Sequence, residues 1–367
     1  MDFASDNAVG ASALVLEALL AANHGAVPAY GNDSYSQRAR DMLNDVFERD
    51  VACFFVATST AANALALGTL CPPWGAIFCH HHAHIANDEC GAPEMFTAGA
   101  KLVGVDGPSA KISPDAFRST LKDFPGGVVR QVQPGALSLS QATKCGTLYA
   151  CDEIATVAEI AHTDGIAVHM DGARFANALV ALGCTPAEMS WTASVDVLSF
   201  GPTKNGTLAC EAVIFFDLAK AENFAFQCKR AGHTLSKGRL LGARMVVYFQ
   251  NDHWLALART ANDHALHLAR GLKDLPGVRL AWDAPANQVF AIIPRSADEA
   301  LKRAGARYYD WGSRGLDPSQ SPAADEVFVR LGHRPRRRAV LYHDRPRRRV
   351  LKSCTADGGT YLALRES

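Results

Sequence analysis

Short apolar runs alternate with amphipathic stretches through the first two thirds of the sequence. Runs of this length are typical of buried strands, and the stretches between them carry apolar residues at helical spacing. One predicted helix covers residues 60–70, a second starts at Ser113-Pro114-Asp115, and a third covers residues 152–163. The predicted strands cover residues 52–57, 76–79, 101–105, 128–132, 166–170, 195–198 and 211–216. This alternation predicts an α/β fold in which a mostly parallel sheet has helices on both faces.

The pattern changes after about residue 249. A long helical pattern covers residues 253–272, and beyond it the predicted elements are strands at 278–282, 288–293 and 327–331 and a helix at 297–303. We therefore predict a large domain, with an N-terminal arm, over residues 1–249. A smaller α+β domain is predicted over residues 250–332.

The last segment, residues 333–367, differs in charge. The whole chain has a formal net charge of zero, but this segment has ten basic and three acidic residues, and its Arg334–Leu341 stretch is echoed by Arg345–Leu351. Three interpretations are open: an arm for nucleic acid or a membrane surface, a solvated tail, or a segment foreign to the domain, such as the product of a shifted reading frame. We favour the third, because the hydrophobic pattern is lost abruptly after Leu331.

Composition agrees with a fold of this size. With 367 residues, of which 48% are apolar, the chain can bury the cores of a large domain and a smaller companion. Its ten cysteines form no Cys-x-x-Cys pair, which is typical of a reduced protein with buried thiols. The apolar stretch Ala11–Ala22 contains Glu17 and is too short to span a membrane, so we expect a soluble, cytoplasmic protein.

Two charged residues follow neighbouring predicted strands. Asp171 ends the run Ile166–Met170, and Lys204 lies in a glycine-containing turn after the run Val195–Leu198. A lysine amine can form a Schiff base with an aldehyde, and an aspartate carboxylate can keep a pyridine nitrogen protonated. The pair therefore predicts a site for pyridoxal 5'-phosphate (PLP), whose protonated ring is an electron sink. The plain alternatives are a surface lysine and a salt bridge between Asp171 and Arg174.

A polar stretch, Thr58-Ser59-Thr60, links the first predicted strand to a helix. The free N–H groups and the dipole of a helix start attract anions, and the hydroxyls of Ser59 and Thr60 can donate to a phosphate. An ordinary N-cap explains the motif when it is considered alone. Together with an aspartate and a lysine at the same sheet edge, the phosphate site is favoured, because ligands gather at the carboxyl ends of such strands.

Four histidines lie within residues 80–84. No carboxylate or cysteine pattern accompanies them, so we expect no metal site. The better functional interpretation is one imidazole stacked on a flat cofactor ring, with His84 as the candidate and His80, His81 and His82 as exposed loop residues. Arg174 is a candidate for holding a substrate carboxylate, because its planar guanidinium suits bidentate contact.

Further motifs occur in a fixed order along residues 2–331. They are Ser5-Asp6-Asn7, Tyr30-Gly31-Asn32-Asp33, Thr58-Ser59-Thr60-Ala61-Ala62-Asn63, His84-Ile85, Pro134–Thr143, Asp171-Gly172-Ala173-Arg174, Gly201-Pro202-Thr203-Lys204-Asn205-Gly206 and Ala286-Asn287-Gln288-Val289-Phe290. In order and spacing they resemble the threonine aldolases, in particular the bacterial low-specificity branch that includes phenylserine aldolases. The resemblance implies the aspartate aminotransferase-like fold of PLP enzymes (fold type I), and a homodimer or homotetramer with sites at subunit interfaces.

The same resemblance assigns the central roles. Lys204 resembles the Schiff-base lysine, Asp171 the partner of the pyridine nitrogen, and His84 the ring-stacking histidine and possible base. Thr143 stands where some family members have a second active-site histidine, so the identity of the base stays open. Family members also follow the strand that contains Arg330 with a further β segment and a helix, which the residues from Gly332 onward do not resemble.

The remaining expected site residues surround these. The resemblance places Ser59 and Thr60, with Arg230 and Lys237 as a cationic pair, at the cofactor phosphate. The residues expected at the substrate are Ser5, Tyr30, Arg174 and Arg330, of which Arg174 is also expected to contact the cofactor and Tyr30 to lie near the subunit interface.

The activity that the resemblance implies is cleavage of L-β-hydroxy-α-amino acids (threonine, allo-threonine or phenylserine) to glycine and an aldehyde. The alternatives within the fold are an aminotransferase, a β-eliminating lyase and a serine hydroxymethyltransferase-like enzyme. An RNA-binding role through the basic tail leaves Asp171 and Lys204 unexplained. We therefore expect a small-molecule amino-acid substrate, with neither nucleic acid nor membrane as a partner.

Overall fold

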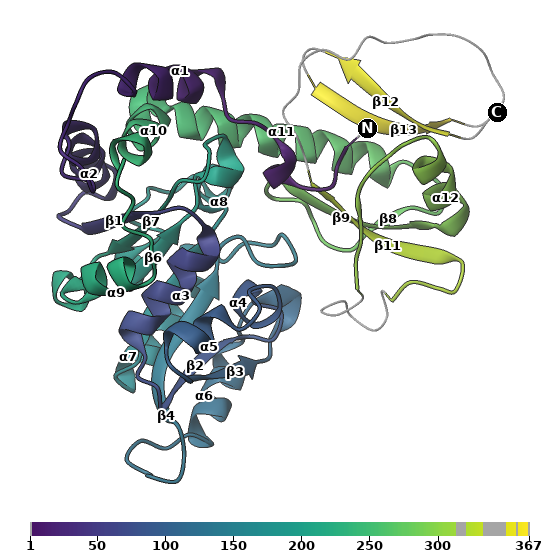
Figure 1. Cartoon of the computed structure of the whole chain (residues 1–367). Helices are drawn as coiled ribbons and strands as arrows, with labels where there is room; N and C mark the ends of the chain where they lie inside the picture. The colour runs from purple at the N-terminus through teal and green to yellow at the C-terminus, as the bar shows by residue number, and fades with distance from the viewer. Residues whose placement is uncertain (1, 313–320, 333–349, 357–358, 366–367) are drawn as a thin grey trace. The chain divides into compact units, whose positions relative to one another are not determined.

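The computed structural model describes residues 2–312, 321–332, 350–356 and 359–365. The chain divides into two compact units (Figure 1). The large unit comprises Gly10–Lys144 and Tyr149–Leu255, and the small unit comprises the described parts of Met1–Val9, Cys145–Leu148 and Ala256–Ser367. Most of the predicted basic tail, including both arginine clusters up to residue 349, lies outside the described residues.

Helices account for much of both units and occupy most of the predicted positions. The α-helices are α1 (Ala13–Ala22), α2 (Ser34–Phe47), α3 (Ser59–Leu70), α4 (His84–Asn87), α5 (Ala92–Phe96), α6 (Pro114–Lys122), α7 (Cys151–Thr163), α8 (Phe175–Leu182), α9 (Phe224–Arg230), α10 (Arg239–Phe249), α11 (His253–Lys273) and α12 (Arg295–Arg303).

A seven-stranded sheet forms the centre of the large unit. In spatial order its strands are β1 (Ala52–Val56), β7 (Glu211–Phe215), β6 (Val197–Phe200), β5 (Ala167–Gly172), β4 (Gln133–Ser140), β2 (Gly75–His80) and β3 (Lys101–Val105). Neighbours from β6 to β3 are parallel, whereas β7 is antiparallel to both β1 and β6. The prediction of a mostly parallel sheet is confirmed.

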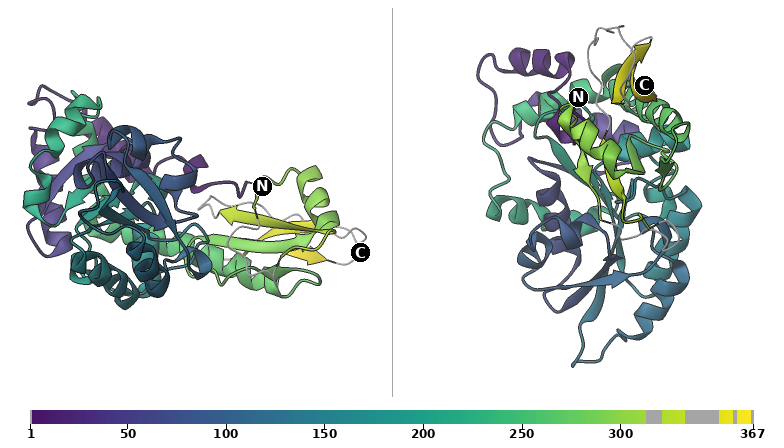
Figure 2. Two further views of the ribbon diagram at one scale, coloured as in Figure 1. Left: turned by 90° about the horizontal axis from the view of Figure 1, so that it is seen from below. Right: turned by 90° about the vertical axis from the view of Figure 1, so that its right-hand side faces the viewer.

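Helices cover both faces of this sheet, as predicted (Figures 1 and 2). Side chains alternate along β6, which explains the two layers. Val197 belongs to a buried apolar cluster with Leu65 of α3. Phe200 points to the opposite face, where its ring centroid lies 5.8 Å from that of Phe175 on α8 and 5.6 Å from that of Phe249 on α10.

The strand predicted at Val128–Val132 is wrong. These residues form a turn, in which the N–H of Gln131 donates to the carbonyl of Val128 at 2.9 Å, and β4 begins only at Gln133. The side chain of Val129 is 100% exposed. An apolar run therefore does not always indicate a buried strand, and here Gly127, with a φ of +80°, places the run in a surface loop.

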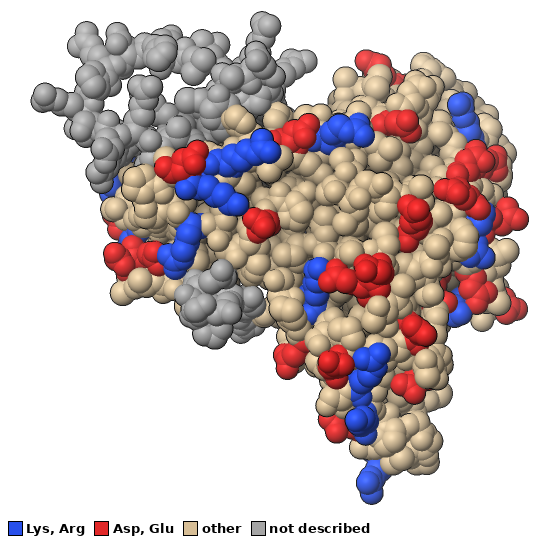
Figure 3. Space-filling view, turned by 180° about the vertical axis from the view of Figure 1, so that it is seen from behind, with Lys and Arg blue, Asp and Glu red and all other residues tan. Residues whose placement is uncertain are grey.

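Charges of both signs are interspersed on the face of the molecule shown in Figure 3. Acidic and basic side chains also form surface ion pairs, such as Lys111 with Glu153 and Lys144 with Asp88. Among the residues that the structure describes, no helix is long and apolar enough to cross a membrane.

The small unit contains a four-stranded antiparallel sheet in the order β10 (Tyr309–Asp310), β11 (Glu326–Gly332), β9 (Gln288–Pro294) and β8 (Arg279–Leu280). The strands predicted at 288–293 and 327–331 and the helix predicted at 297–303 are confirmed. Two further strands, β12 (Val350–Ala356) and β13 (Gly359–Arg365), pair antiparallel, and neither was predicted.

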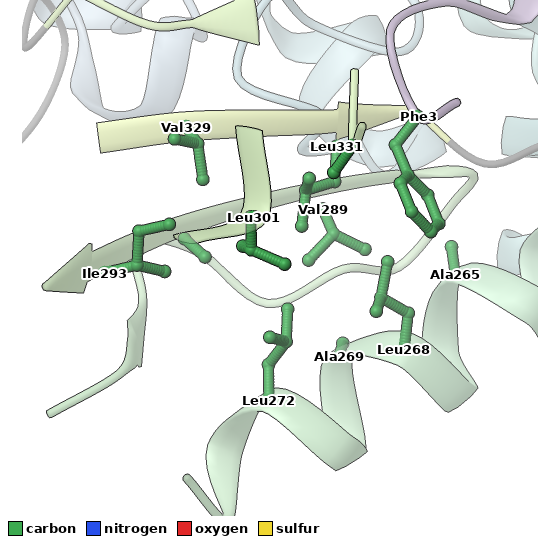
Figure 4. Close-up of a cluster of buried hydrophobic side chains, with 12 residues drawn as sticks. Phe3, Ala265, Leu268, Ala269, Leu272, Val289, Ile293, Leu301, Val329 and Leu331 are labelled. Carbon is green, nitrogen blue, oxygen red and sulfur yellow. The ribbon is translucent and has the colours of Figure 1, made fainter. Parts of the chain in front are cut away.

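The core of the small unit packs α11 against its sheet (Figure 4). Leu268 and Leu272 of α11 meet Val289 of β9 and Leu331 of β11 in one buried cluster. Phe3 belongs to the same cluster, and its carbonyl accepts a hydrogen bond from the N–H of Gly332 at 2.7 Å. The first residues of the chain are thereby fixed to the end of β11.

Candidate functional site

The candidate site is built on the carboxyl ends of β5 and β6, which are parallel neighbours. Asp171 on β5 stands in register with Ser199 on β6. Asp171 is 6% exposed, and its Oδ1 accepts a hydrogen bond from the N–H of Ala173 at 3.1 Å. Because a buried carboxylate is costly without polar or cationic partners, this position indicates a site for a cation or a hydrogen-bond donor.

Lys204 lies in a short 3₁₀ turn, Thr203–Asn205, just beyond the end of β6. The side chain of Asn205 is buried and donates to the hydroxyl of Tyr248 (2.7 Å) and to the carbonyl of Trp254 (2.9 Å). These two hydrogen bonds anchor the turn on the helical layer behind the sheet. The Lys204 side chain itself is half-buried.

The turn with Lys204 and the turn that follows Asp171 are packed together. The N–H of Gly201 donates to the carbonyl of Gly172 at 3.2 Å. A Cβ atom at position 201 would lie 2.6 Å from the Cα of Ala173, so glycine is required for this approach. The structure thus brings the segments of the predicted lysine and aspartate together.

A chain of hydrogen bonds crosses three strands beneath Asp171. The hydroxyl of Ser138 on β4 lies 3.0 Å from Nδ1 of His169, and Nε2 of His169 lies 2.8 Å from the hydroxyl of Ser199. Burial lowers the pKa of His169 to about 4, so the ring is neutral at pH 7. His169 is two residues before Asp171 and shares its face of the sheet. Sequence reasoning missed it, although a histidine inside an apolar run was a usable signal.

The predicted phosphate site is the first turn of α3. Thr58 is the N-cap, and its hydroxyl accepts a hydrogen bond from the N–H of Ala61 at 3.1 Å. Ser59 and Thr60 are half-buried and occupy the first helical turn, where backbone N–H groups have no partner within the helix. The ordinary cap and the anion site are therefore compatible, because different residues serve them.

His84, at the start of α4, is held by a buried acid. Its Nδ1 lies 2.7 Å from Oε1 of Glu89, and the same oxygen accepts a hydrogen bond from the Asn63 amide of α3 at 2.8 Å. The side chain of Glu89 is fully buried, and burial raises its pKa. Neither Glu89 as the partner of His84 nor Asn63 as the partner of Glu89 was predicted from the sequence, because these contacts depend on how α3 packs beside α4.

The interpretation of His80 as an exposed loop residue is wrong. His80 ends β2 and is 7% exposed; its Nε2 donates to the carbonyl of Gly107 at 3.0 Å, and its Nδ1 accepts from the N–H of His82. Burial lowers its pKa. His81 is exposed and lies 3.3 Å from Asp106. In the described part of the chain, no cluster of three or more potential ligands is arranged to hold a metal ion.

The remaining residues of the large unit that were expected at the site are Arg174, Tyr30, Lys237 and Arg230. Arg174 immediately precedes α8, three residues after Asp171, and is half-buried. Tyr30 is 54% exposed, and its N–H donates to the carbonyl of Ser236 at 3.0 Å, next to the exposed Lys237. Arg230 ends α9 and is exposed.

Thr143, which stands where some threonine aldolases have a second histidine, is buried. Its hydroxyl donates to the carbonyl of Ser109 at 3.2 Å. A threonine hydroxyl is a poor base at neutral pH, so His84 is the better candidate for taking a proton.

Ser5 and Arg330 belong to the small unit. The Ser5 hydroxyl accepts from the N–H of Asn7 at 3.1 Å and caps a 3₁₀ turn. Arg330 is 9% exposed, and its guanidinium lies over the ring of Trp311 at 5.3 Å. In the orientation of the Gln288 amide that satisfies both groups, its oxygen accepts from Arg330 Nε at 3.0 Å and Nη2 at 3.1 Å.

Comparison with known proteins shows the family to which the chain belongs. Residues 2–294 match the family model of the β-eliminating lyases. The low-specificity L-threonine aldolase of Pseudomonas aeruginosa is 42% identical over 85% of the chain and 90% of the relative. That of a Pseudomonas species is 41% identical over 89% of the chain and 94% of the relative.

Solved structures agree with the sequence matches. The threonine aldolase of Leishmania major superposes with a TM-score of 0.82 at 27% identity, covering 90% of the chain and 93% of that structure. An aspartate aminotransferase of Rhodobacter sphaeroides superposes with a TM-score of 0.63 at 17% identity, over 90% and 86% of the two chains. The second match concerns the fold alone, and the expected aspartate aminotransferase-like fold is confirmed.

Proposed function

From the premise that the chain is a PLP-dependent lyase of the low-specificity L-threonine aldolase family, we propose that it cleaves L-threonine, L-allo-threonine and L-phenylserine to glycine and the corresponding aldehyde. The observation that carries the proposal is the packing of the turn with Lys204 against the turn after Asp171. This arrangement presents an amine and a buried carboxylate at one edge of the sheet.

The residues of the large unit fit PLP. Lys204 would hold its aldehyde carbon, Asp171 its pyridine nitrogen, and Ser59 and Thr60, at the start of α3, its phosphate. The buried carboxylate of Asp171 supports this assignment, since a protonated pyridine nitrogen is the kind of partner that it needs. When bound, PLP supplies an electron sink for the bond that breaks between Cα and Cβ of the substrate.

We assign the base to His84. Oε1 of Glu89 accepts a hydrogen bond from Nδ1–H of His84, which leaves Nε2 as the nitrogen that can take a proton from the β-hydroxyl of the substrate. Once that proton is removed, the oxygen forms the carbonyl of the departing aldehyde as the bond between Cα and Cβ of the substrate breaks. The carboxylate of Glu89 also stabilises the imidazolium that results.

The substrate carboxylate needs a cationic partner, and Arg174 is the first candidate because it follows Asp171 by three residues. Ser5 and Arg330 are proposed as further substrate-binding groups. The guanidinium of Arg330 is already oriented by Trp311 and Gln288, which lowers the entropy lost on binding.

We also propose that the enzyme is a homodimer or homotetramer, with Tyr30 near a subunit interface and with Arg230 and Lys237 close to the cofactor phosphate. The support comes from exposed apolar side chains: Leu20 on α1 is 71% exposed and Phe226 on α9 is 75% exposed. The buried free thiols of Cys53, Cys79 and Cys210 support a cytoplasmic location.

The test is a product assay. The purified protein is incubated with PLP and each β-hydroxy amino acid, and glycine and aldehyde are measured. The proposal requires both products in equal amounts without an amino acceptor. Amino transfer to a keto acid, or release of ammonia without glycine, would instead show an aminotransferase or a β-eliminating lyase.

A further inference from the structure

Glu211 is a buried acid that has no part in the roles proposed above. It is the first residue of β7 and is 2% exposed. Val213 and Phe215 of the same strand pack in the cluster with α3, and Glu211 shares their face because side chains two residues apart point the same way. Its Oε2 has no hydrogen-bond partner among the residues that the structure describes. An acid left in this state is costly, which suggests a function.

The sheet places Glu211 between two parts of the site. Strand β7 is antiparallel to β1 and β6, so its start lies beside their ends. On one side Glu211 is paired with Val56, the last residue of β1, and the chain continues from there to Ser59. On the other side β6 ends at Phe200, and the turn with Lys204 follows.

One side chain fastens the connection between Lys204 and Glu211. The hydroxyl of Thr203 accepts a hydrogen bond from the N–H of Cys210 at 3.1 Å and donates to the carbonyl of the same residue at 3.3 Å. Thr203 directly precedes Lys204, and Cys210 directly precedes Glu211. These two hydrogen bonds join the ends of the loop between Thr203 and Cys210, and they thereby hold Lys204 and Glu211 near each other.

The surroundings favour the protonated acid. Burial raises the pKa of Glu211 to about 7, an effect that the hydroxyls of Thr203 and Ser59 and the charge of Lys204 oppose. The carboxylate of Asp171 raises it further. The titratable or charged groups that face Glu211 from its own and neighbouring elements are Lys204, Asp171, Cys210 and Tyr248.

We propose that Glu211 is a positioning residue that controls the protonation state of the Lys204 amine. Glutamic acid at position 211 gives its proton to the neutral amine, forming a carboxylate and an ammonium, and the reverse transfer frees the amine; only one proton moves. Only the neutral amine has the lone pair that attacks an aldehyde. The inference rests on the proposed role of Lys204.

The test measures the amine itself, without substrate or cofactor. Full-length protein freed of PLP is treated with trace acetic anhydride between pH 6 and pH 9, and the acetylation rate of Lys204 is followed by mass spectrometry. In Glu211→Gln the stabilising carboxylate is lost. We expect Lys204 to react about tenfold faster than in the wild type at pH 8.5, and equally fast at pH 6, where wild-type Glu211 keeps its proton.

The matched control is Glu222→Gln, because Glu222 is exposed in the same unit. It must give the wild-type profile. Identical Lys204 profiles in Glu211→Gln and the wild type, or a difference that is as large at pH 6 as at pH 8.5, overturn the proposal. If Glu211→Gln does not fold, Glu211→Asp serves instead: it keeps the carboxylate and must retain the wild-type pH dependence. Neither outcome depends on which substrate is cleaved.

Discussion

Nδ1 of His84 lies 2.7 Å from Oε1 of Glu89, and the amide of Asn63 donates to the same oxygen. The two hydrogen bonds fix the carboxyl group, and the carboxyl group in turn fixes the tautomer and the orientation of the imidazole. A histidine held in this way can work as a base through Nε2 alone. The relationship connects α3 and α4, two helices that a sequence pattern does not place side by side.

Replacing Glu89 by glutamine is expected to lower kcat about a hundredfold, because the amide can present its NH₂ group to Nδ1 and no longer stabilises the charged ring. KM should change little, since Glu89 is not proposed to bind substrate. Steady-state kinetics with L-threonine at several pH values checks this. Asp88→Asn is the control, because the Asp88 side chain is 42% exposed and pairs with Lys144. A kcat within threefold of wild type in Glu89→Gln contradicts the assignment.

Lys204→Ala is expected to abolish both the cleavage of L-threonine and the visible absorption band of bound PLP after gel filtration, because no other amine is proposed at the aldehyde carbon of PLP. An absorption spectrum and an aldehyde assay on the same sample check the two effects. Lys122→Ala, which removes an exposed lysine from the end of α6, should leave both unchanged. A variant at position 204 that keeps the band and turns over substrate excludes the lysine assignment.

Gly201→Ala tests the close approach of the two turns. The added methyl group would lie 2.6 Å from the Cα of Ala173, so the turn with Lys204 has to move away from Asp171. We expect a loss of about 1–3 kcal/mol of stability and weaker retention of PLP. Thermal denaturation and a PLP titration measure the two effects. Gly126→Ala is the matched control, because its methyl group meets nothing within 4 Å. Wild-type stability and wild-type retention of PLP in Gly201→Ala would contradict the packing argument.

Much of the fold follows from local patterns. The apolar runs that became β2, β5, β6 and β7 are buried on both faces inside the sheet, so nearly every position is apolar and the strand is visible in one stretch of sequence. The edge strands β1 and β3 are only partly buried, but their short apolar runs are still recognisable. β4 is different: it contains Pro134 and Gly135, and the neighbouring Val128–Val132 run looked more like a strand. Tertiary packing determines which of the two segments becomes a strand. The sheet includes β4, in which Gly135 fits closely against Cys71.

The candidate site also contains residues that the sequence predicts and residues that it does not. Asp171, Lys204, Ser59 and Thr60 follow strands of one parallel sheet, so topology alone predicts that they share an edge. Glu89 and Glu211 could not be linked to His84 or Lys204 from the sequence, because their partners lie on other elements. His169 and Glu211 did leave one signal, which is a titratable residue within or next to an apolar strand.

The buried histidine under Asp171 makes a prediction about acid stability. Its folded-state pKa of about 4 lies below the ordinary value of 6.5. The unfolded chain therefore binds the proton first as the pH falls, so the contribution of His169 is complete above pH 6.5 and is lost progressively as the pH decreases toward 4. At pH 5 the loss is about 2 kcal/mol relative to pH 7.

His169→Gln isolates this effect. Glutamine can still form hydrogen bonds with Ser138 and Ser199 but does not titrate. The free energy of unfolding in urea is measured for both proteins at pH 7 and pH 5. Glu211 and Glu89, whose raised pKa values act in the opposite direction, are present in both proteins and cancel in the difference. The wild type should lose about 2 kcal/mol more than the variant between the two pH values. Equal losses would mean that His169 titrates in the folded protein near its ordinary pKa of 6.5, and that burial does not keep the imidazole neutral at pH 5.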